Sequence, residues 1–104
     1  MIVYNVTVNI DNDVHDEWLN WMRTVHVPDV MRCSNFTKAR ISKVLVDEEQ
    51  GTTYSIQYTA PTMQHYEQYS ETFAPALQAE HRKKFEGKFV AFRTLIEVIE
   101  DFEN

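Results

Sequence analysis

The sequence predicts an α+β fold in which a four-stranded antiparallel sheet carries two helices on one of its faces. The hydrophobic period changes from two residues, typical of strands, to about 3.6 residues, typical of helices, and back again along the chain. These segments follow the order strand, helix, strand, strand, helix, strand. Only two glycines and three prolines interrupt the 104 residues, so we expect one domain that spans residues 1–104.

The first strand and the first helix are predicted from a change of period after residue 10. Alternate residues are apolar over residues 2–10, which indicates a strand with one buried face. An apolar stripe with helical spacing then predicts a helix over residues 13–26. Pro28 cannot donate a backbone hydrogen bond, so we expect this helix to end near His26, while residues 29–33 are open to one extra turn.

Two strands joined by a hairpin are predicted in the middle of the chain. Their expected bounds are 35–46 and 52–60. The short polar segment Asp47-Glu48-Glu49-Gln50-Gly51 joins them, and its glycine suits the left-handed conformation that many hairpins require. The two strands are therefore expected to be antiparallel neighbours.

A second helix and a last strand complete the predicted fold. A helical stripe extends over residues 62–84, with Thr62 suited to the N-cap. Pro75 lies inside this stripe and would cost about 3 kcal/mol in a helix interior, so we expect a kink or a restart there, with Thr72 as the new cap. Residues 88–99 form the last strand. The whole order is that of the ferredoxin-like βαββαβ arrangement.

The face of the sheet that the helices leave uncovered is expected to carry both apolar and polar side chains. Alternation places large apolar groups there, namely Phe36, Val44, Val46, Phe89 and Leu95. It places polar groups between them, of which six are candidate ligand-binding residues: Asn5, Thr7, Lys38, Arg40, Gln57 and Arg93. Because an exposed sheet rarely carries so many large apolar groups, we predict a homodimer that stacks its two sheets. Scattered surface hydrophobic residues on a monomer are the alternative.

The stacked sheets would enclose a cavity with polar, partly basic walls. Its centre is expected to hold three cations, Lys38, Arg40 and Arg93, with Glu97 as the nearby acid. Such a group suits a small anion, for example a carboxylate or a phosphate. The alternative is that the cations pair with acidic residues of the other subunit. The predicted ligand is a small anionic or polar metabolite.

His26 is the candidate catalytic residue. It lies about 100° from the centre of the apolar stripe on the first helix, at the boundary between core and solvent. A histidine at the rim of a pocket can act as an acid or a base near neutral pH. The alternative is an ordinary residue at the end of a helix, stabilised by the helix dipole.

The segment Trp18-Leu19-Asn20-Trp21-Met22-Arg23-Thr24-Val25-His26-Val27-Pro28 and the order of the elements resemble the dimeric α/β-barrel superfamily. Members of that superfamily pack two ferredoxin-like sheets face to face, and several carry a His-x-Pro after the first helix. The whole chain also resembles a family of bacterial proteins of about this length and of unknown function. The resemblance implies the dimer and the cavity rather than an activity, since the superfamily includes cofactor-free oxygenases, haem enzymes, isomerases and ligand sensors.

Several classes of function are not supported by the sequence. His15 and His26 are separated by about 16 Å along a helix, and His65 and His81 are expected to be solvated, so we predict no metal site and no cofactor. The net charge of −6 disfavours nucleic acids and anionic membranes as partners. The N-terminus has no leader-like pattern, and no apolar run approaches the roughly 20 residues of a membrane span, so we expect a cytoplasmic protein.

Three functions remain open on this evidence. The first is a homodimeric protein that binds a small molecule in the cavity on the sheet face. The second is a cofactor-independent enzyme, oxygenase-like or isomerase-like, that uses His26 as acid or base. The third is a structural interaction domain whose cavity is filled by side chains. Whether the chain is an enzyme is not decided by its sequence.

Overall fold

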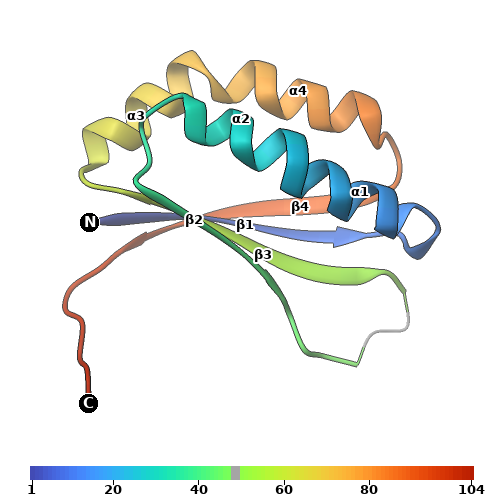
Figure 1. Ribbon diagram of the computed structural model, residues 1–104, viewed down its shortest axis with the longest axis horizontal. Helices are drawn as coiled ribbons and strands as arrows, with labels where there is room; N and C mark the ends of the chain where they lie inside the picture. The colour runs from blue at the N-terminus through green and yellow to red at the C-terminus, as the bar shows by residue number, and fades with distance from the viewer. Residues whose placement is uncertain (48–49) are drawn as a thin grey trace.

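A computed structural model, which describes residues 1–47 and 50–104, has two layers, with the helices above one face of a sheet (Figure 1). The sheet contains β1 (Ile2–Ile10), β2 (Lys38–Lys43), β3 (Thr52–Ala60) and β4 (Phe89–Glu97). Their order across the sheet is β2-β3-β1-β4, and every neighbouring pair is antiparallel. This is the ferredoxin-like arrangement that the sequence predicts.

The strand bounds agree with the prediction except at β2. This strand is shorter than the predicted 35–46, because its pairing with β3 ends soon after Lys43. Of the loop between β2 and β3, Glu48 and Glu49 lie outside the described residues. Gly51 has a φ of 72°, as the hairpin prediction required, and an added Cβ there would overlap the Asn9 side chain.

The first helical segment is longer than predicted. It consists of η1 (Asn12–Val14), α1 (His15–Trp21), η2 (Met22–His26) and α2 (Val27–Arg32). The prediction that the helix ends near His26 is wrong. The reason is that η2 is a turn of π-helix, in which the Val27 N–H donates to the Met22 carbonyl five residues earlier. Pro28 therefore lies in the first turn of α2, where its missing N–H is tolerated.

The second helical segment is broken at the predicted place. Its two parts are α3 (Met63–Thr72) and α4 (Ala74–Lys84), with Pro75 in the first turn of α4. The Thr62 hydroxyl accepts a hydrogen bond from the His65 N–H, so the predicted N-cap of α3 is confirmed. Thr72 is not the cap of α4, since Phe73 occupies that position.

The hydrophobic core lies between the helices and the sheet. Ile10, Trp18 and Val30 have no exposed surface. Phe36 also belongs to this core, with its ring centroid 4.8 Å from that of Tyr69, although it was predicted on the open face. It precedes β2 and so does not follow the alternation of that strand.

The side chains of β4 face the opposite way from the prediction. Across the β1–β4 pair, Arg93 lies beside Val6 and Leu95 beside Tyr4, so Phe89, Ala91, Arg93 and Leu95 lie on the helical side. Since the other set, Val90, Phe92 and Ile96, is equally apolar, alternation alone could not decide between the two faces. The apolar groups on the open face are therefore Val90, Phe92 and Ile96, which are 70%, 65% and 41% exposed.

Candidate functional site

A small cavity lies between the sheet and the helices. Its volume is about 30 Å³, enough for one or two water molecules. Residues of β1, β3, β4, η2, α3 and α4 line it. The side chains with polar atoms in this lining are Tyr4, His26, Tyr58, Tyr69, Gln78, His81 and Arg93. The layers thus bring together titratable groups that are far apart in the sequence.

His26 is placed in the cavity wall by the π-helical turn η2, whose last residue it is. Its ring stacks on that of Trp21 at a centroid distance of 5.1 Å. Its Nδ1 atom is buried and has no hydrogen-bond partner among the described residues. Burial lowers the pKa of His26 to about 4, and the Arg93 charge acts in the same direction, while Asp29 opposes it. At neutral pH the ring is therefore an uncharged base.

His81 is a buried member of the same cluster, and the prediction that it is solvated is wrong. It is 7% exposed, and its ring centroid lies 5.7 Å from that of His26. Its Nε2 lies 2.9 Å from the indole Nε1 of Trp18, which can only donate. Nε2 must therefore be the acceptor, and the proton of the neutral ring is on Nδ1. Burial, followed by the neighbouring His26, Arg93 and Arg82, lowers the pKa of His81 to about 4.

A signal for the burial of His81 was present in the sequence. Leu77, His81 and Phe85 recur at intervals of four residues, which is the spacing of one face of a helix. The histidine therefore continues an apolar stripe instead of belonging to the basic end of α4. A buried histidine needs a hydrogen-bond partner, and Trp18 supplies it from the facing helix α1.

Arg93 lies at the mouth of the cavity. Its Nε donates a 3.0 Å hydrogen bond to the phenolic oxygen of Tyr4, although much of the side chain remains exposed. Burial raises the pKa of Tyr4 in spite of this cation, and burial likewise raises the pKa values of Tyr58 and Tyr69. The cavity therefore contains neutral phenols and neutral imidazoles, with one permanent cation at its entrance.

An open groove adjoins the cavity along α4 and β4. Its volume is about 780 Å³, within the range of sites that hold small molecules. Four residues, Gln78, His81, Ala91 and Arg93, line both the groove and the cavity. A molecule in the groove can thus present one end to the histidines.

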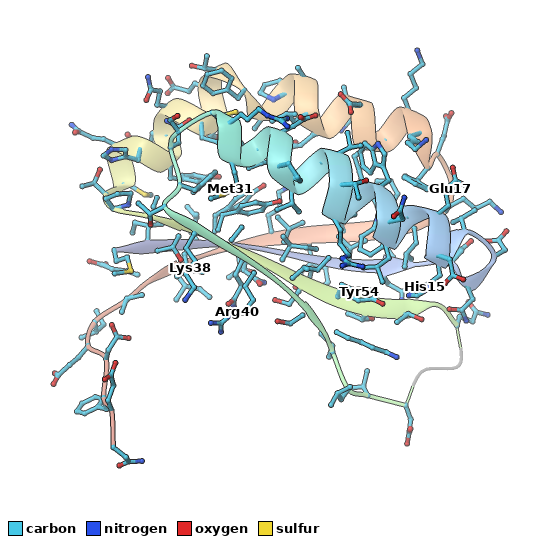
Figure 2. The ribbon with its side chains drawn as sticks, viewed as in Figure 1. His15, Glu17, Met31, Lys38, Arg40 and Tyr54 are labelled. Carbon is cyan, nitrogen blue, oxygen red and sulfur yellow. The ribbon has the colours of Figure 1, made fainter. Side chains whose placement is uncertain are left out.

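The six predicted ligand-binding residues do not form one site. Asn5, Thr7 and Gln57 lie on the open face of the sheet with Lys38 and Arg40. Figure 2 shows Lys38 and Arg40 on the side of β2 away from the helices. Arg93 lies on the other side of the sheet, so the predicted convergence of Arg93 with Lys38 and Arg40 is wrong.

Three polar residues at the centre of the open face form hydrogen bonds with one another. The Ser55 hydroxyl donates to Asn5 Oδ1 over 2.6 Å, and Asn5 Nδ2 donates to the Thr7 hydroxyl over 3.1 Å. These hydrogen bonds give Asn5, Thr7 and Ser55 partners within one chain. A role for these residues in ligand binding stays a prediction.

Clusters of metal ligands and membrane-spanning helices are both absent from the described residues. Within residues 1–47 and 50–104, no group of three or more histidine, cysteine, aspartate or glutamate side chains is placed to hold a metal ion. None of the helices in the described part of the chain is both long and apolar enough to cross a membrane.

Known structures share this fold across the whole chain. HapK from Hahella chejuensis has a TM-score of 0.74 at 10% identity, with 100% of this chain and 98% of that chain covered. A dimeric ferredoxin-like protein from an uncultured marine organism has a TM-score of 0.73 at 15% identity, with both chains fully covered. SnoaB, a cofactor-independent oxygenase from Streptomyces nogalater, has a TM-score of 0.70 at 10% identity and covers 99% of this chain and 98% of its own.

These similarities show the ferredoxin-like fold of the chain, and one of the proteins that share it is described as dimeric, in keeping with the resemblance noted in the sequence. No curated protein matches the chain. A family model described as a domain of unknown function, DUF4286, matches residues 1–99.

Proposed function

The chain therefore belongs to the DUF4286 family, and we propose that it binds a small organic molecule between the helices and the sheet, where His26 acts as a base toward the ligand. The observation that carries the proposal is the buried Nδ1 of His26, which has no partner among the described residues. Leaving such an atom unpaired costs about 1–3 kcal/mol. A ligand that hydrogen-bonds to it removes this cost on binding.

The groups around His26 suit a ligand that gives up a proton. A neutral imidazole has a lone pair that can take the proton, and the low pKa keeps it available at neutral pH. Arg93, at the mouth, can stabilise the negative charge that remains on the ligand. The Nδ1–H of His81 is a second donor in the same cluster. This arrangement favours ligands whose conjugate base is an oxyanion, such as phenols and enolisable ketones.

Catalysis is the second candidate function, and the same residues support it. SnoaB, which shares the fold at low identity, is described as a cofactor-independent oxygenase. That activity is a property of SnoaB, since a shared fold does not determine a shared reaction. For the present chain, the supported step is removal of a substrate proton by His26, with Arg93 facing the resulting oxyanion.

A panel of phenols, 1,3-diketones and their methyl ethers tests the proposal by thermal shift. An ionisable compound at 100 times its Kd is expected to stabilise the protein by about 2.7 kcal/mol. The variant His26→Phe should lose this stabilisation, because phenylalanine keeps an aromatic ring in the cavity wall but has no nitrogen atom that can accept a proton. Lys43→Ala, at the exposed end of β2 and outside the lining of both the cavity and the groove, is the control and should bind as the unchanged protein does. Equal stabilisation of the His26 variant would contradict the proposal.

We infer that the open face of the sheet is covered by a second copy of the chain. Val90, Phe92 and Ile96 form an exposed apolar strip along β4, on a face that the described helices leave bare (Figure 1). A strip of this kind is unusual on a monomer. The marine ferredoxin-like protein of the same fold is described as dimeric, which supports a two-fold arrangement here.

The substitution Phe92→Asp is expected to turn this dimer into a monomer, because it places a charge in the apolar strip. Size-exclusion chromatography with light scattering measures the mass of each species. Leu45→Asp is a suitable control, since Leu45 is 88% exposed but lies outside the sheet. A wild-type chain that is monomeric at micromolar concentration would refute the dimer.

A further inference from the structure

The sizes of the two spaces restrict what can bind. The cavity beside His26, at about 30 Å³, has room for only a few atoms of a ligand. The adjoining groove is about 780 Å³. Any molecule that reaches His26 must therefore leave most of its body in the groove, so the groove rather than the cavity decides which molecules bind.

The walls of the groove are apolar on one side and basic on the other. Phe89 and Ala91 of β4 supply apolar surface, whereas α4 supplies Arg82 and Lys83. The acid in this lining is Glu86. With Arg93, the groove therefore has an excess of positive charge in a protein whose net charge is −6.

The positive charge of the groove is not neutralised within the described part of the chain. The neighbouring cations Lys84 and Lys88 form ion pairs with Glu17 and Asp13. Arg82 and Lys83 form no such pair with any residue among 1–47 and 50–104. Two cations are thus left free to bind an anion beside an apolar wall.

We propose that the α4–β4 groove binds an amphiphilic organic acid, with Arg82 and Lys83 holding its oxyanion group and its apolar body lying on β4. This inference rests on the proposed function, because it assigns the substrate class of the same site. The other end of the molecule enters the cavity beside His26. A carboxylate and a phosphate monoester share the required chemistry, since both present oxygen atoms to a guanidinium or an ammonium group.

Three probes share a naphthalene ring and differ in charge: 2-naphthoate, 2-naphthyl phosphate and the neutral 2-naphthamide. Their comparison separates the contribution of the negative charge to binding from that of the aromatic ring. Isothermal titration calorimetry at low salt is expected to show at least one of the acids binding about tenfold more tightly than the amide. Comparison of the two acids identifies the preferred oxyanion. The preference should weaken as salt is added, because the contacts are exposed.

A pair of double variants tests which cations cause the preference for the acids over the amide. Arg82→Gln with Lys83→Gln should reduce binding of the preferred acid about tenfold and leave the amide within about twofold. Arg23→Gln with Lys43→Gln removes the same charge from two exposed residues that line neither the cavity nor the groove, and should leave the preference unchanged. Equal losses in the two double variants, equal binding of acid and amide, or no binding of either acid at about 1 mM would each overturn the inference.

The same measurements distinguish this inference from the proposed function. The variant His26→Phe is expected to weaken all three probes, since it closes the cavity that each of them enters. If the probes depend on His26 but not on Arg82 and Lys83, the site stands and the assignment of an acidic ligand fails. If they depend on the two cations but not on His26, the groove binds anions apart from the cavity, which overturns the two-ended arrangement.

Discussion

Acidification from pH 7 to pH 4 is expected to destabilise the fold, by up to about 3 kcal/mol for each of two largely buried histidines. His26 and His81 have pKa values near 4 in the folded chain, against the ordinary value of 6.5. The unfolded chain therefore binds protons first. The contribution of the two histidines to the free energy of unfolding is fully present above pH 6.5. It falls with the pH as the unfolded chain binds protons, and it stops falling below pH 4, where the folded chain binds the same protons.

Urea unfolding at closely spaced pH values measures this loss. Carboxyl groups, with ordinary pKa values of about 3.9 to 4.3, also titrate near the lower end of this window, so the comparison with the histidine variants isolates the contribution of the two rings. Each of the variants His26→Phe and His81→Phe should reduce the slope of stability against pH. The control Leu45→Ala changes an exposed side chain without a titratable group and should keep the full slope. A wild-type chain equally stable at pH 7 and pH 4.5 would show that the two rings are not held neutral.

Replacement of Trp18 by alanine is expected to cost about 3–5 kcal/mol, the range for a large buried aromatic side chain. Trp18 has no exposed surface, and its ring packs against that of Tyr54 at 5.2 Å. Its loss also leaves Nε2 of His81 without the donor that fixes the tautomer. Thermal and urea unfolding measure the first effect.

The variant Trp18→Phe separates packing from hydrogen bonding. Phenylalanine keeps most of the apolar volume but has no N–H, so about 1–3 kcal/mol should be lost. Nitrogen chemical shifts of the imidazole ring report the tautomer directly. The wild type should show the proton of His81 on Nδ1, and Trp18→Phe should show a mixture. An unchanged spectrum would mean that Trp18 does not hold this histidine in place.

The sequence was sufficient to predict the order, type and pairing of the elements. Alternation located β1 and β3, and Pro75 located the break between α3 and α4, because both signals depend on local backbone geometry. The direction of the β4 side chains could not be predicted. Both alternate sets of that strand contain large apolar residues, one set facing the helices and the other remaining exposed. Only the pairing register with β1 distinguishes them.

The candidate site was predicted in part. His26 was selected from its position on a helical wheel, and it lines the cavity between the layers rather than one on the open face. The selection of Arg93 with Lys38 and Arg40 depended on the incorrect face of β4. The basic neighbours Arg82, Lys83 and Lys84 indicate a solvated helix end, which is why the sequence does not predict His81 as part of the site. The spacing of His81 with Leu77 and Phe85 does indicate burial, but its hydrogen-bond partner Trp18 lies 63 residues away and does not appear in a local pattern.

The π-helical turn η2 makes the spacing of the chain itself a determinant of the site. A π turn contains one residue more than an α-helix needs to connect the same two ends, and each added residue rotates the rest of the helix by about 100°. A chain with one residue fewer between Trp21 and Pro28 would form a regular helix in which the proline lies in the interior. Its histidine would then face in a different direction. Two proteins could therefore carry the same histidines, arginine and tyrosine in the same order, and only the one that retains this extra residue would assemble them around a cavity.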